Sequence, residues 1–201
     1  MLRILAAVLT MLIVVIPQPA VSAEGAANKG SLLSDAIFGF RFIWRRASLL
    51  GLQTLFFFSN LFASVSGVLF PAMILARTGN DSATLGIVQT AFGVGGVVGG
   101  LLMSTWGGPK RRVHGVLLGF TGSSLLGNVV MGIGQTIPVW YVGAFFWVFF
   151  IPFLNGSNQA IWQAKVAPDV QGRVFSARRL IAQVSAPLGM LVGGVLADRV
   201  F

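Results

Sequence analysis

Long uncharged stretches alternate along this chain with short clusters of charged and polar residues. The stretches that lack Asp, Glu, Lys and Arg cover residues 49–76, 83–109, 113–164 and 180–197. A helix that crosses the hydrocarbon core of a bilayer needs about 20 apolar residues, so the longest stretch has room for two crossings. The turn between these two crossings is expected at residues 135–138, because proline is disfavoured inside a helix.

This pattern predicts an all-α membrane protein, a polytopic helix bundle. Backbone groups in lipid must be hydrogen-bonded within their own segment, which favours helix even where glycine and β-branched residues are frequent. A β-barrel would instead show alternating segments of about ten residues. We therefore expect a transmembrane bundle over residues 49–201 with five full helices, at residues 49–76, 83–106, 115–134, 138–164 and 180–199.

The first 48 residues carry a different pattern. Residues 1–17 have a basic start and an apolar continuation, which fits a partial transmembrane helix or a signal-like segment with a cleavage-like motif at residues 20–23. Residues 18–48 are expected to form a cytoplasmic loop. Within this loop, residues 35–47 interleave aromatic and arginine side chains, which predicts an amphipathic helix at the interface between lipid and water.

The composition agrees with a membrane environment and excludes other classes of protein. Of the 201 residues, 55% are hydrophobic and only 9% are charged, and the mean hydropathy is +0.85. Ordinary soluble domains carry about 25% charged residues. Neither a soluble globular enzyme nor a disordered chain fits these values, so the surroundings are expected to be a lipid bilayer.

The basic residues are sorted between the loops. Eleven of the fourteen Lys and Arg residues lie in residues 17–48, 107–114 and 165–179, whereas residues 77–82 and 135–138 together hold one. The positive-inside rule predicts that the loops at residues 17–48, 107–114 and 165–179 are cytoplasmic in a multi-pass protein of the plasma or inner cell membrane. This distribution favours a partial helix over a signal-like segment at the N-terminus, and we expect no binding to nucleic acid.

Residue types that perform catalysis or bind metal are scarce. The chain has no cysteine and one histidine, and we expect no Asp or Glu at membrane depth. An enzyme activity, a metal site and a cofactor are therefore not expected. The amides in the predicted helices either line a substrate path or join helices at about 1 kcal/mol each. The candidates for the substrate path are Gln53, Asn60, Asn155, Asn158 and Gln159.

Glycines spaced four residues apart occur in three of the predicted helices. At this spacing they share one helix face and allow two backbones to approach closely, which predicts tight helix packing rather than a ligand site. The pairs are Gly95 with Gly99, Gly96 with Gly100, Gly115 with Gly119, and Gly189 with Gly193.

Three segments resemble the major facilitator superfamily of transporters. Residues 99–112 are similar to its loop between helices eight and nine, although Ser104 stands near the position of the usual Asp. Residues 163–179 contain Gly-Arg-Val-Phe after a proline and resemble the loop between helices ten and eleven of its drug and siderophore exporters, the macrolide-efflux and enterobactin-exporter-like group. Residues 38–46 are similar to the interfacial helix before helix seven.

The resemblance implies a C-terminal-half fragment of such a transporter, with helices seven to eleven and the end of helix six. It implies secondary active efflux of an unidentified drug or siderophore-like small molecule by alternating access. The chain alone is expected to be inactive, with a missing N-terminal half or another transporter chain as its partner. The loop residues expected to gate or orient the protein are Lys110, Arg111, Arg112, Arg173, Arg178 and Arg179. The alternative is a small structural or assembly membrane protein without transport activity.

Overall fold

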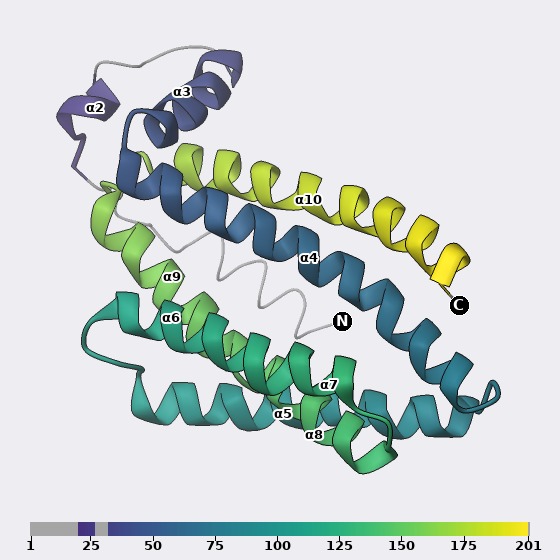
Figure 1. The fold of residues 1–201 in the computed structure, drawn as a ribbon. Helices are drawn as coiled ribbons and strands as arrows, with labels where there is room; N and C mark the ends of the chain where they lie inside the picture. The colour runs from purple at the N-terminus through teal and green to yellow at the C-terminus, as the bar shows by residue number, and fades with distance from the viewer. Residues whose placement is uncertain (1–19, 27–31, 201) are drawn as a thin grey trace, which may run out of the picture.

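A computed structural model describes residues 20–26 and 32–200 and shows them as helices with short links (Figure 1). The partial helix expected at residues 1–17 lies outside these described residues. The helical elements are α2 (Ala23–Ala26), α3 (Leu32–Trp44), α4 (Ala47–Arg77), α5 (Ser82–Trp106), α6 (Arg112–Gly122), the π-helix η1 (Ser123–Val129), α7 (Val130–Ile133), α8 (Ile137–Phe149), α9 (Ile151–Lys165) and α10 (Gln171–Val200).

Within the described residues, five helical stretches are long and apolar enough to cross a membrane. Three of them are the single helices α4, α5 and α10. The fourth is formed by α6, η1 and α7 without a gap, and the fifth by α8 and α9, which meet at Phe150. Pro152 at the start of α9 explains this break, because proline has no backbone N–H to donate. The predicted bundle of five full transmembrane helices is confirmed.

Two helices have different limits from those that the charge pattern suggested. α10 begins at Gln171 and not near residue 180, because the arginines in its first turns are good helix formers. The expected interfacial helix is α3, which ends at Trp44 and not at residue 47. The cause is the extended backbone of Arg46, which lies just before the first residue of α4.

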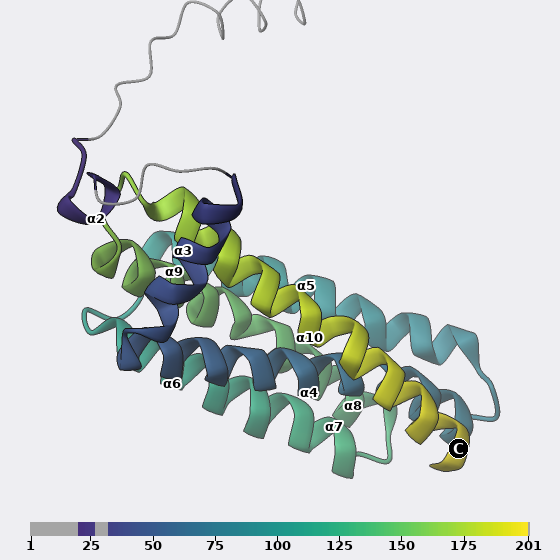
Figure 2. The same cartoon turned by 90° about the horizontal axis from the view of Figure 1, so that it is seen from above.

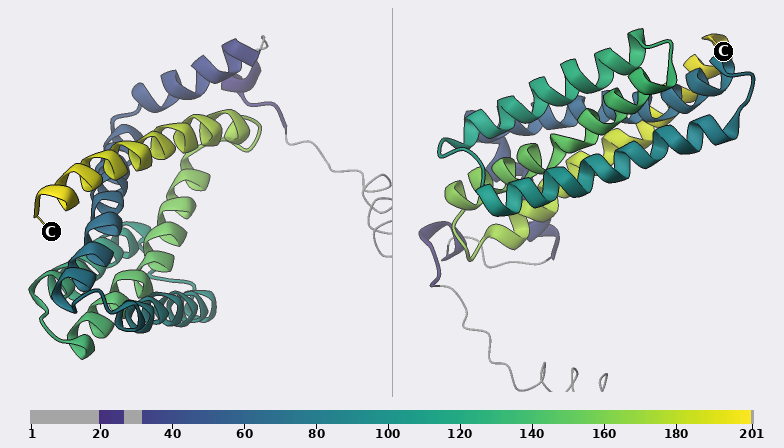
Figure 3. Two further views of the ribbon diagram at one scale, coloured as in Figure 1. Left: turned by 90° about the vertical axis from the view of Figure 1, so that its right-hand side faces the viewer. Right: turned by 90° about the horizontal axis from the view of Figure 1, so that it is seen from below.

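The transmembrane helices associate in pairs that are distant in sequence. α4 packs along α10, α5 along α8, and α6 along α9, as Figure 1 and Figure 3 show. α3 crosses the first turns of α10, which is seen most clearly from above (Figure 2). The α4–α10 and α5–α8 pairs run parallel, because Gly189 and Gly193 meet Leu61 and Val65 in the same order, and Gly95 and Gly99 likewise meet Phe145 and Phe149. The α6–α9 pair is antiparallel, since Gly115 meets Ser157 and Gly119 meets Leu154.

Three of the four predicted glycine pairs lie at these helix contacts, which confirms their role in packing. The fourth pair does not, because a Cβ added to Gly100 meets no atom within 4 Å. A Cβ atom added to Gly95 or Gly99 on α5 would overlap the backbone carbonyl oxygen of Phe145 or Phe149 on α8. A Cβ added to Gly189 on α10 would lie 2.6 Å from the carbonyl oxygen of Leu61 on α4. The remaining contacts of the same kind join Gly193 to Val65 and Val68, Gly115 to Ser157, and Gly119 to Leu154.

Two buried hydrophobic clusters hold the bundle together, one toward each end. The first joins α3, α4, α9 and α10 and comprises Phe42, Ile43, Leu49, Trp162, Val166, Val170, Val174 and Ala177. The second joins α4, α5, α7 and α8 and comprises Met73, Ile74, Val88, Ala91, Met131, Trp140 and Ala144. Burying such side chains stabilises a contact by about 1.5–3 kcal/mol each in water, whereas between helices in lipid the gain comes from close packing.

Basic residues gather at one end of the bundle. α3, the α5–α6 link and the α9–α10 link lie at the same end, and the α4–α5 and α7–α8 links lie at the other (Figure 1). We call the first the basic end. Its basic residues include Arg41, Arg45, Arg46, Lys110, Arg111, Arg112, Lys165 and Arg173.

Candidate functional site

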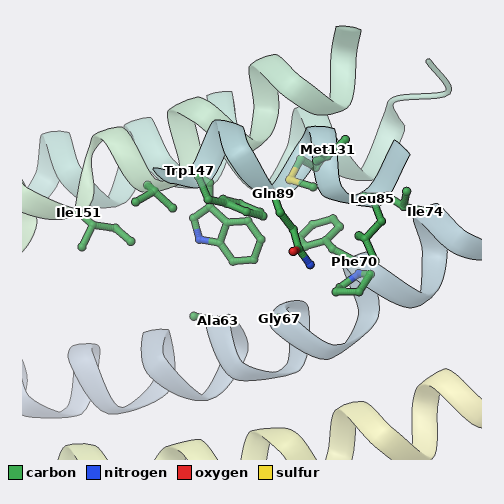
Figure 4. A pocket seen from close by; sticks show the side chains of 13 residues that line it. Ala63, Gly67, Phe70, Ile74, Leu85, Gln89, Met131, Trp147 and Ile151 are labelled. Carbon is green, nitrogen blue, oxygen red and sulfur yellow. The ribbon is translucent and has the colours of Figure 1, made fainter. Parts of the chain in front are cut away.

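A cavity of about 310 Å³ lies between α4 on one side and α5 and α8 on the other (Figure 4). Ala63, Gly67 and Phe70 form its α4 wall. Gln89 reaches it from α5 and Trp147 from α8, and Met131, Ile151 and further apolar side chains complete the lining. The cavity adjoins the second hydrophobic cluster and shares Ile74, Val88 and Met131 with it.

Aromatic rings shape this cavity. The ring of Trp147 meets that of Phe70 edge to face, with centroids 5.0 Å apart and an angle of 67° between the planes. The ring of Trp147 also meets that of Phe92 edge to face, with centroids 5.4 Å apart and an angle of 77° between the planes. Edge-to-face contacts of this kind are attractive, so Trp147 of α8 connects α4 and α5 at the cavity.

Gln89 gives the cavity its main polar character. It contributes the only side-chain oxygen among the described residues that line the cavity, and Trp147 adds an indole N–H. None of these described lining residues is charged. The cavity is therefore suited to apolar molecules that carry few polar groups.

A second polar site joins three of the residues selected from the sequence. Arg178 on α10 donates through Nη1 to Oε1 of Gln159 on α9, at 2.9 Å. The backbone carbonyl of Arg178 accepts a hydrogen bond from Nε2 of Gln53 on α4, at 3.2 Å. The guanidinium lies over the ring of Trp162, 5.1 Å from its centroid. This polar cluster of Gln53, Gln159 and Arg178 links three helices next to the first hydrophobic cluster.

The other three substrate-path candidates lie in separate surroundings. Asn155 is exposed and Asn60 is partly exposed. Asn158 is only 2% exposed, and its Oδ1 has no hydrogen-bond partner among the described residues. None of the five candidates lines the cavity between α4, α5 and α8, so their part in a substrate path stays a prediction.

The sequence contained only a weak signal for Gln89. It is one of several amides in the predicted helices, and nothing in the one-dimensional pattern separates it from the rest. What distinguishes it is the direction in which it projects from α5, toward the gap beside α4 (Figure 4). That direction depends on how the helices pack around one another.

The candidate gating residues occupy two places at the basic end. Lys110, Arg111 and Arg112 are exposed on the α5–α6 link, where Nη1 of Arg112 donates to the carbonyl oxygen of Gly107 at 2.8 Å. Gly107 has a φ of 75°, a left-handed conformation that favours glycine and ends α5. On α10, Arg179 is exposed and Arg173 lies 5.8 Å from the centroid of the Phe38 ring on α3.

The segment at residues 20–26 is attached to the α9–α10 link. Oδ2 of Asp169 accepts hydrogen bonds of 2.8 Å from both the backbone N–H and the hydroxyl of Ser22. The N–H of Ser22 is the main cause that lowers the pKa of Asp169, and partial burial opposes it. The residues of the cleavage-like motif thus lie at the basic end of the bundle. Among residues 20–26 and 32–200, no cluster of His, Cys, Asp or Glu could hold a metal ion.

Comparison with known proteins identifies relatives among efflux proteins. Macrolide efflux protein A of Streptococcus pyogenes is 28% identical over 141 residues, which cover 66% of this chain and 33% of that protein. Macrolide efflux protein A of Enterococcus faecalis is 28% identical over 131 residues, which cover 61% of this chain and 38% of that protein. The match thus spans little more than a third of these curated relatives. No family profile and no solved structure matches the chain.

These relatives confirm the resemblance to the macrolide-efflux group of transporters that the loop segments suggested. The five long apolar helices fit the same assignment. The chain is therefore a multi-pass helical membrane protein related to drug-efflux proteins of the macrolide-efflux group.

Proposed function

We propose that this chain forms part of a transporter that exports small organic molecules across the cell membrane by alternating access. The similarity to macrolide efflux protein A carries the proposal, because both relatives are named for the efflux of a drug class. The chemistry is physical movement of a bound molecule, with no covalent step and hence no enzyme activity.

The distribution of contacts in the bundle supports alternating access. The α4–α10 pair meets the other helices mainly through two hydrophobic clusters, one toward each end. Between these clusters, α4 and α5 are separated by the cavity. In such an arrangement one end can loosen while the other stays closed, which is the motion that alternating access requires.

The apolar outer faces support a partner. α5 and α10 each expose a row of large side chains, such as Val97 and Leu101 on the first and Leu191 and Val195 on the second. Five helices with such faces do not enclose a path of their own. We propose that a second set of transporter helices covers one of these faces, that lipid covers the others, and that this chain alone does not transport.

The proposed orientation places the basic end at the cytoplasm. The links that carry Lys110, Arg111 and Arg112, and Lys165 with Arg173, share that end with α3. Short loops rich in Lys and Arg are retained on the cytoplasmic side during insertion. The link at residues 78–81 and the link at residues 134–136 then face outward.

A chimaeric transporter tests the proposed function. The matched third of the Enterococcus faecalis macrolide efflux protein A is replaced by this chain, and accumulation of a radiolabelled macrolide is measured in sensitive cells. We expect accumulation to fall relative to cells with an empty vector, and to stay unchanged when this chain is expressed alone. A chimaera that is inserted in the membrane but leaves accumulation unchanged would contradict the function. Saturable efflux by the chain alone would contradict the need for a partner.

A further inference from the structure

We propose that the cavity between α4, α5 and α8 binds an uncharged, largely apolar small molecule, and that Gln89 recognises its hydrogen-bonding group. This inference deepens the proposed export function and rests on it, because it names the class of molecule that this site would take. Neither the relatives nor the loop segments point to this cavity. It follows from the size, the charge and the polar groups of the cavity itself.

The volume limits the size of the ligand. Binding sites for drug-sized molecules commonly measure about 300–1,000 Å³. The present cavity, at about 310 Å³, lies at the lower end of that range. It therefore suits a compact molecule of up to about three rings, or the apolar part of a larger one, and does not enclose a macrocycle.

The lining sets the charge of the ligand. None of the described residues that line the cavity carries a charge. Moving an ion from water into such a site without a counter-charge is strongly unfavourable, whereas a neutral apolar molecule gives up little hydration free energy on entering it. The flat rings of Trp147 and Phe70 favour a ligand with an aromatic face.

Gln89 provides the recognition. Its side chain is exposed in the bundle, and it has no hydrogen-bond partner among the described residues. The amide therefore offers both a donor and an acceptor at the open side of the cavity. Figure 4 shows the amide directed into the space between Phe70 and Trp147. An amide left unpaired in an apolar site is unfavourable, so a ligand with a hydroxyl or carbonyl group gains by pairing with it.

Gly67 offers a way to fill the cavity without disturbing the fold. It lines the cavity from α4, and a Cβ added there meets no atom within 4 Å. Gly51 on the same helix is equally open but does not line the cavity. Gly67→Leu and Gly51→Leu therefore make the same chemical change on the same helix, one inside the cavity and one outside it.

Dye binding to the full chain in phosphatidylcholine vesicles tests the site. The probe is N-phenyl-1-naphthylamine, a neutral two-ring fluorophore with an attached phenyl group, and the signal is saturable energy transfer from tryptophan to the dye. The unchanged chain and Gly51→Leu are expected to bind with affinities within about twofold of each other. Gly67→Leu is expected to lose at least about tenfold in affinity, because leucine occupies part of the cavity.

The role of Gln89 is tested by competition with two ligands of nearly equal shape. 2-Naphthol is expected to displace the dye from the unchanged chain at a concentration about fivefold lower than 2-methylnaphthalene, since one added hydrogen bond has about that effect. Gln89→Leu is expected to remove this difference. Gln163→Leu, at an exposed amide on α9 outside the cavity, should retain it.

The outcomes separate this inference from the proposed function. Equal dye binding by Gly67→Leu and the unchanged chain would overturn the cavity as a ligand site, whatever the chimaera does. A preference for 2-naphthol that survives Gln89→Leu would overturn the role of Gln89. Dye binding that depends on Gly67, together with a chimaera that does not lower accumulation, would support the site and overturn export.

Discussion

Asp81 shows how one carboxylate ends a loop and starts a membrane helix. As the N-cap of α5, it accepts hydrogen bonds from the hydroxyl of Thr84 at 2.5 Å and from the backbone N–H of Ala83 at 2.9 Å. The Thr84 hydroxyl is the largest cause that holds the pKa of Asp81 below its ordinary value of 3.8, and the Ala83 N–H is the next. Asp169 has a lowered pKa for a similar reason, through Ser22.

These two carboxylates predict a loss of stability in acid. A carboxylate whose pKa is lower in the folded than in the unfolded state stabilises the fold. This contribution is fully present when the pH is above the ordinary pKa of about 3.8, and it is lost as the pH falls through the lower pKa of the folded state. The thermal midpoint in detergent should thus be steady from about pH 7 to 5 and decrease below about pH 4. Asp81→Asn keeps a good N-cap and should make that decrease shallower. An unchanged acid profile in Asp81→Asn would exclude this contribution.

The polar cluster predicts different effects for two amides on α9. Gln159→Leu leaves the Arg178 guanidinium without its acceptor and should reduce the free energy of unfolding by about 1–2 kcal/mol. Asn155→Leu changes an exposed amide on the same helix and should have an effect within about 0.5 kcal/mol. Reversible unfolding in mixed micelles measures both. Equal effects of the two substitutions would show that the hydrogen bond to Arg178 does not stabilise the bundle.

At the scale of single residues, the sequence identified the right residue types but not their surroundings. Amides in apolar helices need partners, and Gln53 and Gln159 have them. Which amide lines the cavity depends on the rotation of each helix about its axis. The uniformly apolar helices show little difference between their faces, so the sequence does not reveal that rotation.

At the scale of the helices, the segments long and apolar enough to cross a membrane could be predicted from the sequence. The interruptions within these segments could be predicted only in part. The fourth predicted helix contains Pro152, a sufficient reason for the break at Phe150. The π-helix η1 had no such signal. Its Gly127 packs against the backbone of Trp147, and the preceding Gly122 packs against the ring of Phe150, so this widened turn faces the region where α8 gives way to α9.

The contact between α5 and α8 predicts a sharp difference between adjacent glycines. Gly99→Ala would drive a Cβ atom into the carbonyl oxygen of Phe149 and should destabilise the fold by about 1–3 kcal/mol. Gly100→Ala adds the same atom where no neighbour lies within 4 Å and should be neutral or slightly stabilising. Thermal unfolding in detergent distinguishes them. Equal midpoints for the two variants would contradict the close contact of these helices.

For the whole molecule, the charge pattern predicted which links share an end. The links that follow α5 and α9 meet α3 at the basic end (Figure 1). The pairing of α4 with α10 could not be predicted in the same way, because short links fix only the antiparallel order of successive helices. Glycine spacing showed where a close contact occurs, and the partner became evident only in three dimensions.

The proposed export function requires that the five helices cross the membrane with the basic end at the cytoplasm. The chain contains no cysteine, so single cysteines can be labelled without background. Ser82→Cys and Thr136→Cys lie at the end opposite the basic end, and Lys110→Cys and Gly172→Cys lie at the basic end.

Labelling of these four variants in intact cells with a membrane-impermeant maleimide tests this arrangement most directly. We predict rapid labelling at residues 82 and 136, and labelling at residues 110 and 172 only after the membrane is permeabilised. The opposite pattern would contradict the orientation, and equal labelling of all four in intact cells would contradict the five-helix topology.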